Sequence, residues 1–170
     1  MDALMGLRSS QRHATDWIAA AVAGFAAGAV LMVLDLVWSA LFNPGGPWRT
    51  SHMIAPIFLG DSALRSTGFG FNAGVVAVAL AIHYGVGVVF GLATGWVLAR
   101  LDLDTTPAHA IAAGAVMGVL LYLVNFHFVV VNFLPWLADL VGGPTLAAHV
   151  VFGSVAGLLY WRLNRTATEP

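Results

Sequence analysis

The sequence predicts an all-α integral membrane protein in which four transmembrane helices form two parallel helical-hairpin repeats. Of the 170 residues, 59% are hydrophobic and 9% are charged, and the mean hydropathy is +0.86. These values lie outside the range of soluble globular domains. In addition, the run from Leu80 to Leu92 returns at a constant offset as the run from Leu146 to Leu158. Such self-similarity indicates two copies of one structural unit.

Matched polar residues strengthen this interpretation. His83 in the first half matches His149 in the second, and Asp35 matches Asn125 at a second constant offset. We therefore expect residues 1–170 to form a single membrane domain. Its two repeats are expected over about 17–101 and about 108–165.

The first apolar run covers residues 17–42. At about 1.5 Å per residue, it is long enough to cross a hydrocarbon core of about 30 Å. A cleaved signal peptide would have a shorter apolar core and a small-residue cleavage site, so we expect a retained span. The segment 43–72 is too polar to span and too apolar for a free loop. We expect it to lie at the membrane interface, partly helical, with Trp48 as an anchor.

Three further spans follow. The second covers about 73–101 and ends in a short polar turn, after which Pro107 sits where a new helix can begin. The third covers about 108–134, and the fourth covers about 145–163. Between them, residues 135–144 form a shorter counterpart of the first interfacial segment.

The arginines predict the orientation, because positive residues flanking short loops are retained in the cytoplasm. Five arginines fall on one predicted side and two on the other, which places both termini in the cytoplasm. The two hairpins then insert the same way up and form a parallel repeat. The first group comprises Arg8, Arg12, Arg100, Arg162 and Arg165, and the second comprises Arg49 and Arg65.

The composition also excludes several function classes. With no cysteine, the chain has no disulfide, thiolate nucleophile or cysteine-based metal site. All seven basic residues are arginines and the net charge is -1, which argues against a nucleic-acid partner, because phosphate binding needs clustered positive charge. We see no Ser-His-Asp or paired-carboxylate arrangement, so we predict no catalytic residues, no metal site and no enzymatic activity.

Glycines spaced by four mark the predicted contact faces of the helices. Small residues at this spacing let helix backbones approach closely in a membrane, where lipid provides no hydrophobic drive for association. We expect the partners of these helices to be one another, the lipid bilayer and the transmembrane helices of other chains. The predicted packing residues are Gly24, Gly28, Gly87, Gly91, Gly114, Gly118, Gly153 and Gly157.

Polar side chains share these glycine faces and lie at similar depths in the outer half of the bilayer. We therefore expect them to converge near the axis that relates the repeats. An ionisable group at membrane depth costs at least about 2.5 kcal/mol on insertion scales, which makes each a candidate functional residue. The predicted intramembrane cluster comprises Asp35, His83, Asn125, His127 and His149.

Three interpretations of this cluster remain open. In the first, the side chains only fix helix register, with Asp35 held by His83, and no cofactor is bound. In the second, His83 and His149 are the two axial ligands of a haem b, and the neighbouring glycines admit the flat macrocycle. In the third, the cluster lines a path for protons or a small solute, and Asp35 and His83 exchange a proton.

The runs 48–56, 122–127 and 149–153 resemble those of a loosely defined family of small, uncharacterised four-helix bacterial inner-membrane proteins. The resemblance implies a multi-pass protein of the bacterial inner membrane and a subunit role beside a larger complex. We accordingly predict a non-enzymatic accessory or structural membrane protein. A bis-His haem b protein and a small proton or solute channel or transporter are the alternatives.

Overall fold

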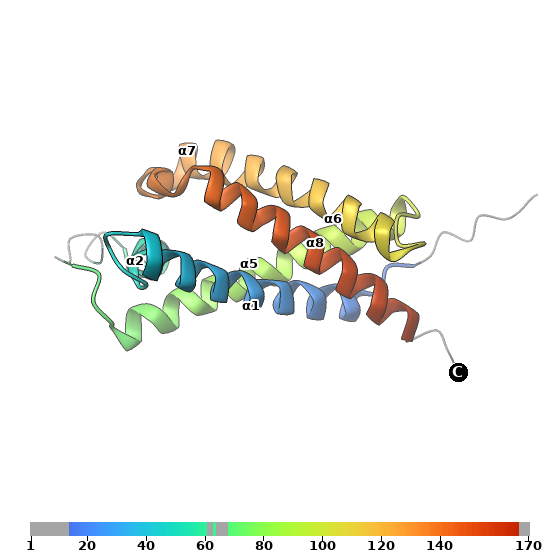
Figure 1. Cartoon of the computed structure of the whole chain (residues 1–170), viewed down its shortest axis with the longest axis horizontal. Helices are drawn as coiled ribbons and strands as arrows, with labels where there is room; N and C mark the ends of the chain where they lie inside the picture. The colour runs from blue at the N-terminus through green and yellow to red at the C-terminus, as the bar shows by residue number, and fades with distance from the viewer. Residues whose placement is uncertain (1–13, 61–62, 64–67, 167–170) are drawn as a thin grey trace, which may run out of the picture.

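In the computed structural model, the chain folds into a bundle of long helices (Figure 1). The structure describes residues 14–60, 63 and 68–166, and these contain no strand. Four stretches are helical, long enough and apolar enough to span a membrane: Trp17–Phe42, Ala73–Arg100, Pro107–Phe133 and Gly143–Asn164. The prediction of an all-helical chain with four such helices is confirmed.

Polar caps set the beginnings of the first three long helices. The Asp16 carboxylate accepts a hydrogen bond from the backbone of Ala19 and opens α1 (Trp17–Phe42). Asn72 caps α5 (Ala73–Arg100) in the same way. Thr106 caps α6 (Pro107–Tyr122). Pro107 is the first residue of α6, where the backbone N–H that proline lacks would have no partner within the helix.

The third span differs from the uniform α-helix that the sequence predicts. After α6 the backbone continues as the π-helix η1 (Leu123–Val130), and a short α7 (Val131–Phe133) completes the span. A π-helix has the wider i→i+5 hydrogen-bonding pattern and is rare. Apolar periodicity gives no signal for it, because the same hydrophobic residues suit either helix. The fourth span, α8 (Gly143–Thr166), is also longer at both ends than the predicted 145–163.

The two ends of the bundle differ in character. The described ends of the chain and the turn 101–106 lie at one end, which we name the termini end (Figure 1). At the opposite end, the loop end, lie α2 (Arg49–Ile54), α3 (Pro56–Leu59) and the 3-10 helix η2 (Pro135–Leu140). The segment predicted to be interfacial is therefore partly helical.

Two helical hairpins make up the bundle. In hairpin one, α1 packs against α5, and an added Cβ on Gly24 would overlap the backbone of Gly87 and Gly91. In hairpin two, α6 packs against α8, and an added Cβ on Gly114 would overlap the backbone of Gly153. In both hairpins, glycine faces glycine and the two helix backbones touch.

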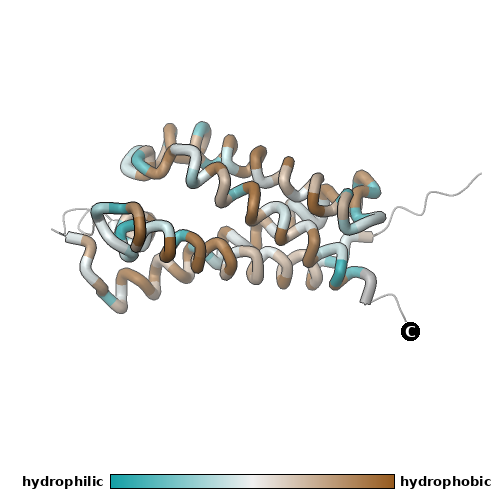
Figure 2. Tube along the Cα trace, viewed as in Figure 1, coloured by the Kyte–Doolittle hydropathy of each residue, from teal (hydrophilic) through white to brown (hydrophobic). Residues whose placement is uncertain are grey.

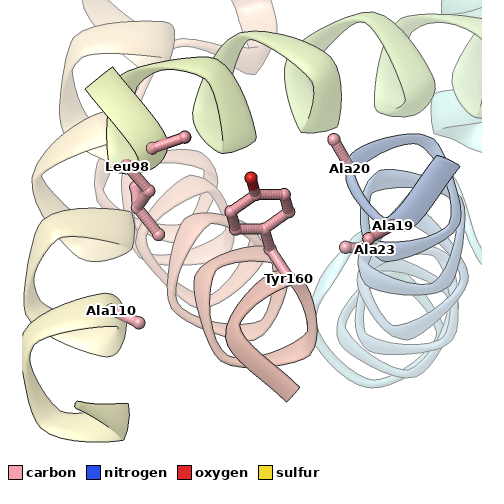
Figure 3. Packing of buried hydrophobic residues seen from close by; sticks show 7 residues of the cluster. Ala19, Ala20, Ala23, Leu98, Ala110 and Tyr160 are labelled. Atoms are coloured by element: carbon pink, nitrogen blue, oxygen red, sulfur yellow. The ribbon is translucent and has the colours of Figure 1, made fainter. Parts of the chain in front are cut away.

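Near the termini end the two hairpins share a core. The buried ring of Tyr160 on α8 lies among small residues of α1, with Leu98 of α5 and Ala110 of α6 close by (Figure 3). The Tyr160 hydroxyl accepts a hydrogen bond from the backbone N–H of Asp16 at 3.3 Å. Further along, Ala27 of α1 packs with Phe152 of α8 in a second shared cluster. All four spans thus meet in this half of the bundle.

The core at the loop end is built differently. Here Met53 of α2 packs into a buried cluster with residues of α6, η1 and η2, namely Tyr122, Phe126, Val130 and Leu137. No α1 or α5 residue belongs to this cluster as described. At the loop end, the segment that connects the helices of hairpin one therefore makes the apolar contact with hairpin two.

The outward faces of the long helices are apolar. Hydrophilic residues gather mainly towards the two ends, whereas hydrophobic residues follow the lengths of the helices (Figure 2). Large apolar side chains are among the most exposed, including Ile18 at 79% and Val131 at 66%. Such surfaces are stable in contact with lipid tails and unfavourable in water.

The glycine contacts predict a sharp difference between two substitutions on the same helix. Gly91→Ala should destabilise the protein by about 1–3 kcal/mol, because its Cβ would meet the backbone of Gly24 and Ala20. Gly85→Ala should be neutral or slightly stabilising, because nothing lies within 4 Å of its Cβ position. Thermal unfolding in detergent micelles measures both. Equal effects would show that α1 and α5 are not in backbone contact at Gly91.

Candidate functional site

Asp35 lies in the loop-end half of α1 and is half-buried. Its carboxylate accepts a hydrogen bond from the hydroxyl of Thr50 on α2 at 3.1 Å. The hydrogen-bond partner of Asp35 is therefore Thr50, and the expected contact with His83 stays a prediction. The bond joins α1 to the segment that follows it, so this carboxylate fixes the position of α2.

His83 bonds across hairpin one. From α5 its Nε2 lies 2.9 Å from the backbone carbonyl oxygen of Gly28 on α1. The helices leave room for this contact, because a Cβ on Gly28 would meet only side-chain atoms of His83 and Tyr84, at 3.7–3.9 Å. This bond joins the two helices of hairpin one.

His149 bonds within its own helix. Its Nδ1 lies 2.8 Å from the carbonyl oxygen of Thr145, one turn earlier in α8. A Cβ on Gly118 of α6 would overlap the backbone carbonyl of His149, so the backbones of α6 and α8 are in contact beside this residue. The rings of Tyr122 and Phe126 pack edge-on against His149, with centroids 5.7 and 5.6 Å away.

The second half of the predicted cluster does not repeat the first. Asn125 and His127 both lie on the π-helix η1, where each residue advances by less than the 100° of an α-helix. The prediction that Asn125 shares one stripe with Gly114 assumed a regular α-helix across this segment, and it stays a prediction. Asn125 is half-buried, whereas His127 is exposed, with its ring against Tyr122 at 5.6 Å. Asp35, His83 and His149 are half-buried, and His127 lies on an outward face.

The hydrogen bonds of His83 and His149 determine which ring nitrogen donates a proton and which carries a lone pair. A carbonyl oxygen can only accept a hydrogen bond, so His83 donates from Nε2 and His149 donates from Nδ1. In its neutral form, each ring then carries a lone pair on the other nitrogen. Together with the Asp35 carboxylate, these atoms are proton acceptors that lie within the candidate membrane spans.

The contacts of His83 and His149 also determine which of their atoms could bind a haem iron or another metal. The Nε2 of His83 is engaged by the Gly28 carbonyl, and two aromatic rings cover His149. The nitrogens that could ligate an iron are therefore Nδ1 of His83 and Nε2 of His149. Within the described ranges, no group of three His, Asp or Glu side chains could hold a metal ion.

Sequence reasoning missed the contacts that side chains make at the loop end. Thr50 bonds Asp35, and the Trp136 indole donates to the Met53 carbonyl at 3.1 Å. Nearby, Arg49 and Asp139 form an ion pair at 3.4 Å. Only the spacing of Thr50 and Met53 carried a signal, because residues three apart lie on one face of a helix.

Comparison with known proteins found no matching family model, no matching curated protein and no matching solved structure. The function must be argued from this site. The resemblance to small four-helix bacterial inner-membrane proteins stays a prediction.

The bond between Thr50 and Asp35 predicts a graded response to substitution at position 50. Thr50→Val keeps the side-chain shape but removes the donor, and should lower the free energy of unfolding by about 1–3 kcal/mol, because it leaves a half-buried carboxylate without this bond. Thr50→Ser retains the hydroxyl and should cost less. Chemical or thermal unfolding in detergent gives both values. If the valine variant were as stable as the wild type, the bond would not contribute to stability.

Proposed function

We propose that this chain is a non-enzymatic integral-membrane helix-bundle protein that acts as an accessory or structural subunit. One observation carries this proposal: three of the polar side chains inside the spans are bonded within the chain. Asp35 accepts from Thr50, His83 donates to the Gly28 carbonyl and His149 donates to the Thr145 carbonyl. The first two bonds join different helices, and bonds of that kind fix the positions of helices in a membrane.

The outward position of His127 supports association with other transmembrane helices. This side chain is exposed and lies in the third span, beside large exposed apolar residues such as Val124 and Phe128. An ionisable group facing lipid is unfavourable, whereas a neighbouring helix can supply a hydrogen-bond partner. The partner in this proposal is a second copy of the chain or a larger membrane complex.

The proposed location is the bacterial inner membrane, with both termini in the cytoplasm. Among the described residues, Arg100 and Arg162 lie at the termini end and Arg49 lies at the loop end. Arg8, Arg12 and Arg65 lie outside the described residues. The arginine asymmetry supports this orientation, and the resemblance supports the choice of membrane.

Conduction of protons is the second candidate, and the lone pairs of the two histidines favour it. Asp35, His83 and His149 all lie in candidate membrane spans, and each neutral histidine carries a lone pair on the ring nitrogen that does not donate. Chains of Asp, Glu and His at membrane depth are typical of proton relays. The haem b alternative has no comparable contact in its favour.

A paired experiment separates these functions. If the cluster is structural, His83→Gln and His149→Gln should each lower stability by about 1 kcal/mol, because each loses one hydrogen bond to a carbonyl. The wild-type protein should then show no pH-driven flux in liposomes and no absorbance above the aromatic band. Both measurements use the same purified sample.

Two results would contradict the structural role. A Soret band that is lost in either histidine variant would establish the haem protein. A flux that stops in Asp35→Asn while the protein stays folded would establish the proton conductor.

A further inference from the structure

Residues 49–59, comprising α2 and α3, occupy a distinctive position in the bundle. Towards the termini end, the hairpins pack directly through α1 and α8. At the loop end, α2 contacts α1, α5 and η2, and so bridges the two hairpins. Figure 1 shows α2 at this end, beside α1 and across from the start of α8.

One face of α2 makes the bridge. Thr50 and Met53 are three residues apart and therefore point the same way. Thr50 bonds Asp35 of hairpin one, whereas Met53 is 8% exposed and packs against Tyr122 and Phe126 of hairpin two. These two aromatic rings also pack edge-on against His149, so Met53 and His149 pack against the same pair of rings.

Glycines in the left-handed region flank this segment on both sides. Gly46 has a φ of +74° before α2, and Gly60 has a φ of +72° after α3. Nothing lies within 4 Å of a Cβ built at either residue. Glycine adopts such a backbone without steric cost and can change its dihedral angles readily, which suits a hinge.

The contacts between the segment and hairpin two are of unequal strength. The Arg49–Asp139 ion pair is weak, because the Asp139 side chain is 74% exposed. The indole bond from Trp136 and the Met53 packing are the stronger contacts with hairpin two. On the side of hairpin one, Thr50 bonds Asp35 and α2 packs on α5. Loss of the contacts with hairpin two would open that side of the segment while the shared core at the termini end stays intact.

We infer that residues 49–59 form a hinged lid, which opens at the loop end and admits water to Asp35, His83 and His149. The lid rotates about Gly46 and Gly60. When the lid is closed, the Met53 side chain packs against hairpin two and excludes water. Access to the polar group is then a local opening and does not require the hairpins to separate. This inference does not depend on whether the cluster has a structural role or conducts protons.

Acylation of the histidines by diethyl pyrocarbonate, followed by peptide mass spectrometry, tests the lid in the purified full-length protein. Met53→Ala should raise the acylation rate of His149 by about tenfold or more, because removal of the Met53 side chain favours the open state. Phe58→Ala is the matched control in the same lid, since Phe58 is 77% exposed and should leave the rate unchanged. The exposed His109 reports the activity of the reagent in every sample.

Gly91→Ala controls for global unfolding, because it weakens hairpin one far from the lid. At equal overall stability it should raise His149 acylation much less than Met53→Ala. Equal rates in these two variants, or no increase in Met53→Ala, would overturn the lid.

Hydrogen exchange in the unmodified protein gives a second test that needs no variant. The amides of α2 should exchange at least about tenfold faster than those in the middle of α1 and α8, because the lid opens without the bundle. Exchange of all three at one common rate would show that α2 moves only when the whole bundle unfolds.

Discussion

Backbone contact between glycine faces is the constraint on which the rest of this structure depends. In a membrane, helices gain nothing from burying apolar side chains away from lipid, so close van der Waals contact must hold them together. Gly24 meets Gly87 and Gly91 in one hairpin, and Gly114 meets Gly153 in the other. These contacts fix how far apart the helices lie, and the separation decides which polar side chains reach across.

The two matched histidines have different surroundings. Around Gly28 the space facing α5 holds side-chain atoms, and His83 reaches the Gly28 carbonyl. Around Gly118 the backbone of α8 itself fills that space, and His149 bonds to Thr145 in its own helix. Two residues matched in the sequence thus have different partners and different proton-donating nitrogens.

Much of the fold was predictable because its causes are local. Length and apolar composition determine a span, and the first span begins at Trp17 and ends at Phe42 as predicted. The glycine spacing also predicted which faces would meet. By contrast, the π-helix around Asn125 was not predictable, because no side-chain pattern distinguishes it from an α-helix. Thr50 was missed for another reason: its bond to Asp35 depends on how the interfacial segment folds back over α1, which periodicity does not determine.

A double-mutant cycle on the glycines tests the central claim that each hairpin is held by its own backbone contact. Gly24→Ala and Gly91→Ala remove the same contact, so their effects on the free energy of unfolding should be less than additive, by more than about 0.5 kcal/mol. Gly24→Ala and Gly153→Ala act on different hairpins and should add. Additive effects within hairpin one, or equally strong coupling between the hairpins, would contradict the account.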